Sequence, residues 1–207
     1  MLGAVILAGG RATRLGGIDK PAVAVGGRTL LAAVVAAART AGAGQVVVVG
    51  PEQPGLAARF VREDPPGDGP VPALRRGLDE LASRAGGPGA PGQVAVLAAD
   101  LPFLRAADLR ALLAAADGRN GAVLADDEGH RQWLIGCWDR RALSAAAAGY
   151  PGSSLRGLMT PLDPAPVVID LDPGEPPPWL DCDTGADLDR ARGWGQRRPG
   201  TTTLSSG

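Results

Sequence analysis

Residues 4–23, AVILAGGRATRLGGIDKPAV, combine residue types that are suited to binding a polyphosphate. The four glycines come as the pairs 9–10 and 16–17, and such pairs let backbone N–H groups approach an anion. Arg14 and Lys20 add positive charge around them. Lys20 is the only lysine among 21 Lys and Arg residues, and the planar guanidinium of arginine does not replace its compact ammonium. We therefore expect a phosphate-binding loop, with a solvated turn between strand and helix as the alternative.

The spacing of the glycines excludes two familiar phosphate-binding motifs. A Walker A motif requires G-x-x-x-x-G-K-[ST], but Gly17 is followed by Ile18 and Asp19 before Lys20, and no hydroxyl residue comes after the lysine. The dinucleotide pattern G-x-G-x-x-G is absent because the glycines are paired. The remaining pattern, LAGG-x3-R-x-GG-x-DK, occupies residues 7–20.

The elements that must position this loop alternate along the first half of the chain. Short apolar runs of strand length are followed by Ala- and Leu-rich segments of helical period. The expected strands are Val5–Ala8, Gln45–Val49 and Val94–Ala99, and the expected helices are Thr29–Ala41, Ala73–Ala85 and Ala107–Ala116. Thr29 is the expected N-cap of its helix and Gly42 its stop. This order predicts an open α/β sheet, in which ligands bind beyond the carboxyl ends of the strands.

The second half is less regular. Strands are expected at 122–126 and 132–138, as a hairpin around Glu128-Gly129, and near 167–171; helices are expected at 141–148 and 186–194. Residues 195–207 have almost no apolar content. We therefore expect a single domain over residues 1–194, with a Rossmann-like, mostly parallel mixed sheet flanked by helices, and a disordered tail over 195–207.

Composition narrows the functional classes. The formal net charge is −1, so no polybasic surface for nucleic acid or membrane is expected, and aromatic residues are only 3% of the chain. Cys137 and Cys182 lack metal-ligand spacing and lie in apolar, strand-like runs, which is typical of buried free thiols in a reducing compartment. The first apolar run is too short for a signal peptide or a membrane span. These features favour a soluble, cytoplasmic domain.

LAGG-x3-R-x-GG-x-DK resembles the signature loop of the nucleotidyltransferase superfamily, and most closely that of the molybdenum cofactor guanylyltransferases, which join GMP to molybdopterin. Three further segments resemble motifs of that family: GPVPALRRGL (69–78), AADLPFL (98–104) and WLDCDTGADL (179–188). The resemblance therefore extends to about residue 194. It implies the nucleotide-diphospho-sugar transferase type of fold, transfer of a nucleoside monophosphate from an NTP, and GTP and a phosphorylated acceptor as substrates. It also implies a protein partner that donates molybdopterin or receives the finished cofactor, a molybdoenzyme.

The resemblance also implies a role for individual residues. The expected catalytic residues are Lys20, Arg14 and Asp100, and the expected nucleotide-binding residues are Leu7, Ala8, Gly9, Gly10, Lys20, Asp64 and Asp100. Asp100, at the end of an apolar strand, would hold Mg²⁺ against the nucleotide phosphates. Its alternative role is to cap the following helix. Asp64 would accept hydrogen bonds from guanine N1–H and N2–H₂, or it is a solvated loop acid.

Several positions depart from the family pattern. The family tends to have asparagine after its second strand, where this chain has Gly50, and a His-Pro pair where this chain has Gln132-Trp133. Asp183 could add a second metal carboxylate or cap the last helix, and His130 is expected on a surface hairpin. The DK ending of the loop favours GTP and molybdopterin over CTP. A cytidylyltransferase, a sugar-phosphate nucleotidyltransferase and a non-catalytic nucleotide-binding module are the alternatives.

Overall fold

The computed structural model describes residues 1–9, 14–15, 18–19, 23–65, 67–83, 90–182 and 184–196. For residues 14–15, 18–19 and 195–196 the description covers the backbone alone. No helix among the described residues has the length and the apolar character needed to cross a membrane.

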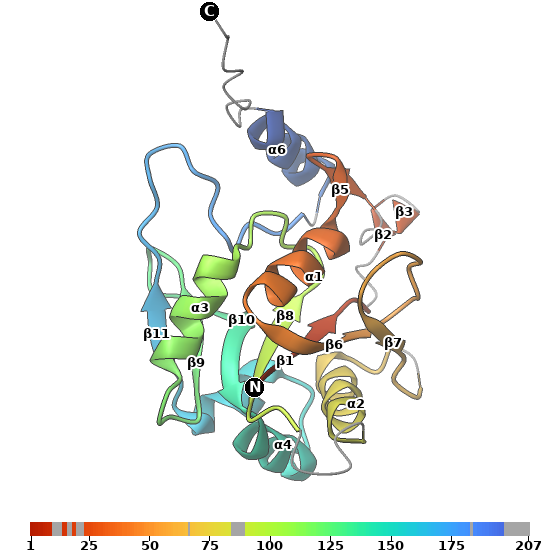
Figure 1. Ribbon diagram of the computed structural model, residues 1–207, viewed down its shortest axis with the longest axis vertical. Coiled ribbons are helices and arrows are strands. Elements are labelled where there is room, and N and C mark those ends of the chain that lie inside the picture. Colours follow the sequence, from red (N-terminus) through yellow and green to blue (C-terminus); the bar gives the residue numbers. More distant parts are fainter. Residues whose placement is uncertain are drawn as a thin grey trace, which may run out of the picture.

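One mixed sheet organises the described part of the chain (Figure 1). Its seven strands have the order β11-β9-β10-β8-β1-β6-β7. They are β1 (Leu2–Leu7), β6 (Ala43–Val49), β7 (Arg59–Val61), β8 (Gln93–Ala98), β9 (Gly121–Ala125), β10 (Arg131–Asp139) and β11 (Ala165–Val168). All neighbouring pairs are parallel except those of β10, which is antiparallel to both β8 and β9. The predicted mostly parallel mixed sheet is therefore confirmed.

Helices cover both faces of the sheet. They are α1 (Leu30–Thr40), α2 (Pro70–Ser83), α3 (Ala106–Ala115), α4 (Arg140–Gly149), α5 (Leu155–Met159), the 3-10 turn η2 (Thr160–Leu162) and α6 (Gly185–Gln196). Two short antiparallel pairs precede α1, namely β2 (Arg14–Leu15) with β3 (Ile18–Asp19), and β4 (Ala24–Val25) with β5 (Arg28–Thr29). Figure 1 shows α1 and α3 in front of the sheet and α6 above β5.

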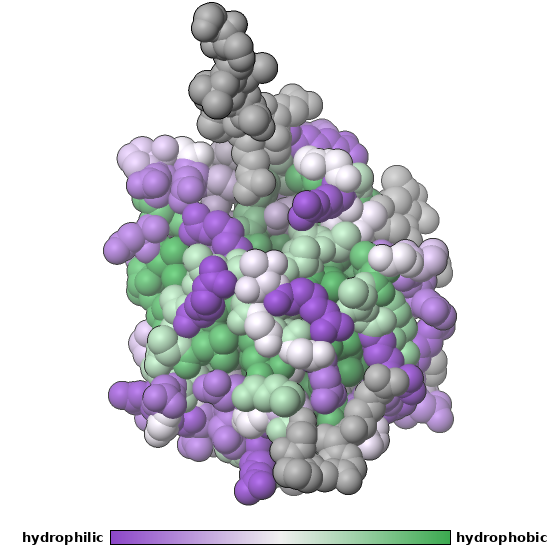
Figure 2. All heavy atoms as spheres, viewed as in Figure 1, coloured by the Kyte–Doolittle hydropathy of each residue, from purple (hydrophilic) through white to green (hydrophobic). Residues whose placement is uncertain are grey.

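The core has two layers because successive side chains of a strand point to opposite faces. In β1, Ala4 and Ile6 pack on the side of α1 and α3, whereas Val5 and Leu7 pack on the side of α2 and α4. All six residues of β1 are buried, as expected for a central parallel strand. On the face drawn in Figure 2, hydrophilic residues are spread among apolar ones.

Most predicted elements lie within a few residues of the observed ones. Thr29 is the N-cap of α1, since its Oγ1 accepts a hydrogen bond from Ala32 N at 3.1 Å, and Gly42 follows the helix with φ of 102°. The hairpin around Glu128-Gly129 is confirmed. Two details were wrong. Cys182 is buried but lies outside the strands, and the last strand ends at Val168 rather than near residue 171.

Candidate functional site

Hydrogen bonds between strand ends join the loops at the carboxyl edge of the sheet. Ala8 N donates to Val49 O at 2.9 Å, and Ala99 N donates to Leu7 O at 3.2 Å. Because β6, β1 and β8 are parallel neighbours, the loops that follow them start side by side, with adjacent strands about 4.8 Å apart. The fold thus provides the ligand position that an open α/β sheet is expected to have.

Four of the predicted site residues lie together at this edge. Leu7 and Ala8 are buried and Gly9 is exposed, so the chain reaches the surface at Gly9. Asp100 directly follows Ala99, whose N–H is held by β1, and its side chain is half-buried. The backbone of Asp100 therefore starts beside the end of β1, and its role as a metal ligand stays a prediction.

The helix-cap alternative for Asp100 is wrong. The helix after β8 starts at Ala106, and its N-terminus is capped by Asp108, whose Oδ2 accepts from Arg105 N at 2.8 Å. The side-chain hydrogen bond to Asp108 also raises the pKa of Arg105. Capping is thus completed five residues beyond Asp100 without its help.

The rest of the predicted phosphate-binding loop is described only in part. Gly10 and Lys20 lie outside the described residues, as does Asp183. The backbone of Arg14 forms β2, where it pairs with Asp19 of β3. The roles of Lys20, Arg14 and Gly10 therefore remain predictions from the sequence.

Gly50, where relatives were expected to have asparagine, has no room for a side chain. A Cβ built on Gly50 would lie 2.8 Å from Ala8 O and 2.9 Å from Ala8 Cβ. The Gly50 N–H is used in a 2.9 Å hydrogen bond to Val61 O. In this chain, β6 therefore contributes no side chain to the site from this position.

The loop after β7 brings two adjacent carboxylates to the same edge. Asp64, the predicted guanine contact, is exposed, whereas Glu63 is buried with 7% of its surface accessible. Glu63 Oε1 accepts a hydrogen bond from Gly67 N at 2.9 Å. Sequence reasoning missed Glu63, because an acid in a loop rich in Pro and Gly is normally solvated and nothing in the pattern marks it as buried.

The start of β10 contains Gln132 and Trp133, which stand where the family was expected to have a His-Pro pair. Between Gln132 and Gly136 the register of β10 shifts relative to β9, and the guanidinium of Arg131 lies 5.8 Å from the centre of the Trp133 ring. Gln132 Nε2 donates to Asp126 Oδ2 at 3.1 Å.

Asp126 also orders the hairpin turn between β9 and β10, because its Oδ1 accepts hydrogen bonds from Glu128 N and His130 N. Desolvation opposes ionisation of its carboxyl, but backbone N–H donors outweigh that effect and lower its pKa. The expected surface position of His130 is confirmed, since its side chain is 70% exposed.

The closing segment packs on the flanks of the site. Cys182, Leu188 and Ala191 form a small buried cluster with Val23 and Leu30. Trp194 of α6 contacts Phe103 edge-to-face, with ring centroids 6.0 Å apart at 83°. One helix thus touches both the chain that leaves the first loop and the loop that contains Asp100.

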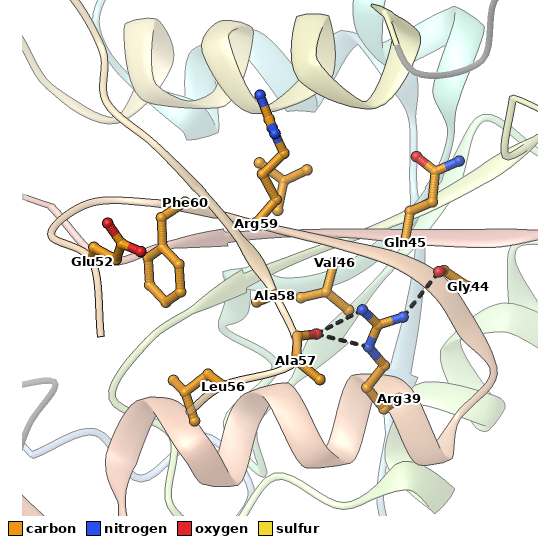
Figure 3. A pocket seen from close by; sticks show the side chains of 11 residues that line it. Arg39, Gly44, Gln45, Val46, Glu52, Leu56, Ala57, Ala58, Arg59 and Phe60 are labelled. Carbon is orange, nitrogen blue, oxygen red and sulfur yellow. Dashed lines mark hydrogen bonds between the residues drawn. The ribbon is translucent and has the colours of Figure 1, made fainter. Parts of the chain in front are cut away.

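A cavity of about 530 Å³ lies elsewhere, along the outer edge of the sheet (Figure 3). It is lined by β6, the residues before β7 and the end of α1. Arg39 closes part of it, since Nη2 and Nε donate to Ala57 O at 2.6 and 3.0 Å, and Nη1 donates to Gly44 O at 2.9 Å. Of the predicted site residues, those that the structure describes with their side chains do not line this cavity.

Comparison with known proteins identifies the class to which this geometry belongs. Residues 4–166 match the family described as MobA-like NTP transferase domain. A molybdenum cofactor guanylyltransferase from Acidiphilium cryptum is 31% identical over 201 residues, which cover 92% of this chain and 93% of that protein.

Two solved structures have the same fold. Molybdopterin-guanine dinucleotide biosynthesis protein A from Archaeoglobus fulgidus matches with a TM-score of 0.70 at 18% identity, covering 96% of this chain and all of that one (100%). Rv0371C from Mycobacterium tuberculosis, solved in complex with manganese, matches with a TM-score of 0.61 at 20% identity and covers 93% of this chain and 97% of that one.

The mostly parallel sheet, with its loops gathered at the carboxyl edge, is that of a nucleotidyltransferase. The chain belongs to the MobA-like NTP transferase family.

Proposed function

We propose that this protein transfers GMP from GTP to molybdopterin and releases pyrophosphate. The observation that carries the proposal is the junction of the Leu7–Gly9 backbone with Asp100, fixed by the 3.2 Å hydrogen bond from Ala99 N to Leu7 O. The similarity to a molybdenum cofactor guanylyltransferase over 92% of the chain supports the choice of substrates.

In the proposed reaction, the acceptor phosphate attacks the α-phosphorus of GTP in line, and pyrophosphate leaves from the opposite side. No covalent enzyme intermediate is needed, so catalysis consists of positioning and charge neutralisation. Backbone groups of Leu7, Ala8 and Gly9 bind the base and sugar, and the charges of Lys20 and Arg14 neutralise the triphosphate. One unit-charge contact at 4 Å contributes roughly 4 kcal/mol at an effective dielectric constant near 20.

The half-buried carboxylate of Asp100 fits a hard divalent cation. Mg²⁺ prefers oxygen ligands and is usually held by one or two carboxylates together with substrate phosphates. In this proposal Asp100 holds the ion at the mouth of the site, where it would offset phosphate charge. We also propose that Asp100 binds Mg²⁺ and that Asp64 binds guanine. The proposal includes a cytoplasmic location, where thiols such as Cys137 stay reduced.

The test is a transfer assay with purified protein, GTP, Mg²⁺ and molybdopterin. We expect pyrophosphate release together with a product whose mass includes GMP. Release with CTP instead would indicate a cytidylyltransferase, and release with a sugar phosphate as acceptor would indicate a sugar-nucleotide enzyme. Nucleotide binding without release under any of these conditions would indicate a non-catalytic binding module. A protein that donates molybdopterin, or a molybdoenzyme that receives the product, would be sought by adding it to the same assay.

A further inference from the structure

Three charged residues are buried among the described residues, and two of them have structural roles. Glu80 is paired with Arg59 between β7 and α2, and Asp108 caps α3 through Arg105. Glu63, in the loop after β7, is the third, with only 7% of its surface accessible. Burying a carboxylate is costly unless hydrogen bonds satisfy it, so its position requires an explanation.

The carboxylate of Glu63 lies beside the exposed end of the first loop. A Cβ built on Gly9 would be 3.5 Å from Glu63 Oε1 and 3.9 Å from Oε2. Gly50 contributes no side chain here, whereas Glu63 places a polar side chain beside Gly9. A carboxylate disfavours triphosphate on this side, so we infer that a nucleotide bound here directs its base toward Glu63 and its Mg²⁺-bound phosphates toward Asp100.

The hydrogen bond from Gly67 N to Glu63 Oε1 also closes the turn that contains Asp64. Gly67 has φ of 83°, a left-handed conformation that glycine adopts without steric cost. Asp64 projects from this turn into solvent, while Glu63 anchors it from the buried side. The direction in which Asp64 points therefore depends on Glu63.

We propose that Glu63 is a positioning residue for base selection. Its carboxylate closes the turn through the Gly67 N–H and lies beside Gly9, so that Asp64 meets the N1–H and N2–H₂ donors of guanine. This inference rests on the proposed use of GTP. It adds a residue that does not touch the reacting phosphates and acts through the turn it holds.

Two substitutions separate the reach of Glu63 from its charge. Glu63→Asp keeps the charge but is one methylene too short to reach Gly67 N, whereas Glu63→Gln keeps the reach and an oxygen that accepts the same hydrogen bond. Asp68→Ala is the control, because it removes an exposed carboxylate from the same loop. Dissociation constants for GTP, ITP and CTP are measured with Mg²⁺ and without acceptor, after thermal unfolding has shown that each variant is folded.

ITP lacks the N2 amino group, so the ratio of ITP to GTP dissociation constants reports on Asp64. Loss of one hydrogen bond to a charged group corresponds to about a tenfold change. We expect Glu63→Asp to lower this ratio about tenfold while CTP binding stays constant, and Glu63→Gln and Asp68→Ala to keep most of the wild-type ratio.

Three results would each overturn the positioning role: equal weakening of binding for all three nucleotides, an unchanged ITP-to-GTP ratio in Glu63→Asp, or a lowered ratio in Glu63→Gln alone. The last result would mean that the charged carboxylate of Glu63 contacts the nucleotide directly. A wild-type protein that binds the three nucleotides equally would overturn it as well. The binding measurements contain no acceptor and are therefore independent of the transfer assay. A protein that prefers GTP in binding but transfers nothing would refute the proposed function, whereas the role of Glu63 would still be judged from the ITP-to-GTP ratio.

Discussion

Gly77 lies where α2 packs directly against the central strands β1 and β6. It is buried in the middle of the helix, and a Cβ built there would overlap Val5 Cγ1 of β1 and lie 3.1 Å from Val49 Cγ2 of β6. Substitution by alanine must therefore push α2 away from the two strands that end at the candidate site.

The expected loss combines two opposing effects. Overpacking of a core costs about 1–3 kcal/mol, whereas alanine in a helix interior is about 0.5–1 kcal/mol more favourable than glycine. These ranges leave a net loss for Gly77→Ala of about 0–2.5 kcal/mol, with a middle value of about 1 kcal/mol. For a chain of this size a loss of about 1 kcal/mol lowers Tm by roughly 2–4 °C.

Urea denaturation of wild type, Gly77→Ala, Val5→Ala and the double variant measures this. Removing the Val5 methyl groups makes room for the new methyl, so the double variant should be about 1 kcal/mol more stable than the sum of the single effects predicts. Gly193→Ala in α6 is the control, because no atom lies within 4 Å of its added Cβ and its stability should rise slightly. A Gly77→Ala variant as stable as wild type, or strictly additive effects with Val5→Ala, would refute the packing argument.

Three further predictions concern the site and the core. Asp100→Asn should abolish transfer with little change in the unfolding temperature, and near wild-type turnover at saturating Mg²⁺ would exclude Asp100 as the metal ligand. Lys20→Arg should be about as slow as Lys20→Ala in single-turnover assays, because displacing the reacting phosphate by about 1 Å can cost on the order of 100-fold in rate. Equal rates for Lys20→Arg and wild type would mean that Lys20 is only a solvated cation. Burial raises the pKa of Cys137 to about 12, whereas a thiol in the unfolded chain has a pKa of about 8.5. The unfolded state therefore loses its proton first as pH rises, and the stability of wild type relative to Cys137→Ala should fall between about pH 8.5 and 12; a pH-independent difference in urea midpoint would contradict this.

The first half of the fold could be predicted because its signals are local. Continuous apolar runs such as Gln45–Val49 indicate strands buried on both faces, and Thr29 marks a helix start by its own side chain. Asp100 could be predicted for the same reason, since it ends such a run. The second half was less regular, and Cys182 illustrates the error: it is buried by packing against Leu188 and Ala191 without forming a strand.

Features that depend on long-range contacts gave no local signal. The three residues of β7 become a strand only because Val47–Val49 of β6 offer them a parallel partner. Glu63 is buried only because β7 places the following loop beside Gly9. The need for glycine at position 50 comes from the approach of Ala8, which is 42 positions earlier in the sequence.

The candidate site is supported by its flanks as much as by its loops. Phe103 follows Asp100 by three residues and meets Trp194, while Leu30, at the start of α1, packs with Cys182 and its neighbours in one cluster. A change in α6 would therefore affect both sides of the candidate site, because this helix supports the chain after the glycine loop and the loop that contains Asp100. The distance between the chain before α1 and the loop that contains Asp100 is thereby set by packing, which is stiff, rather than by the loops alone.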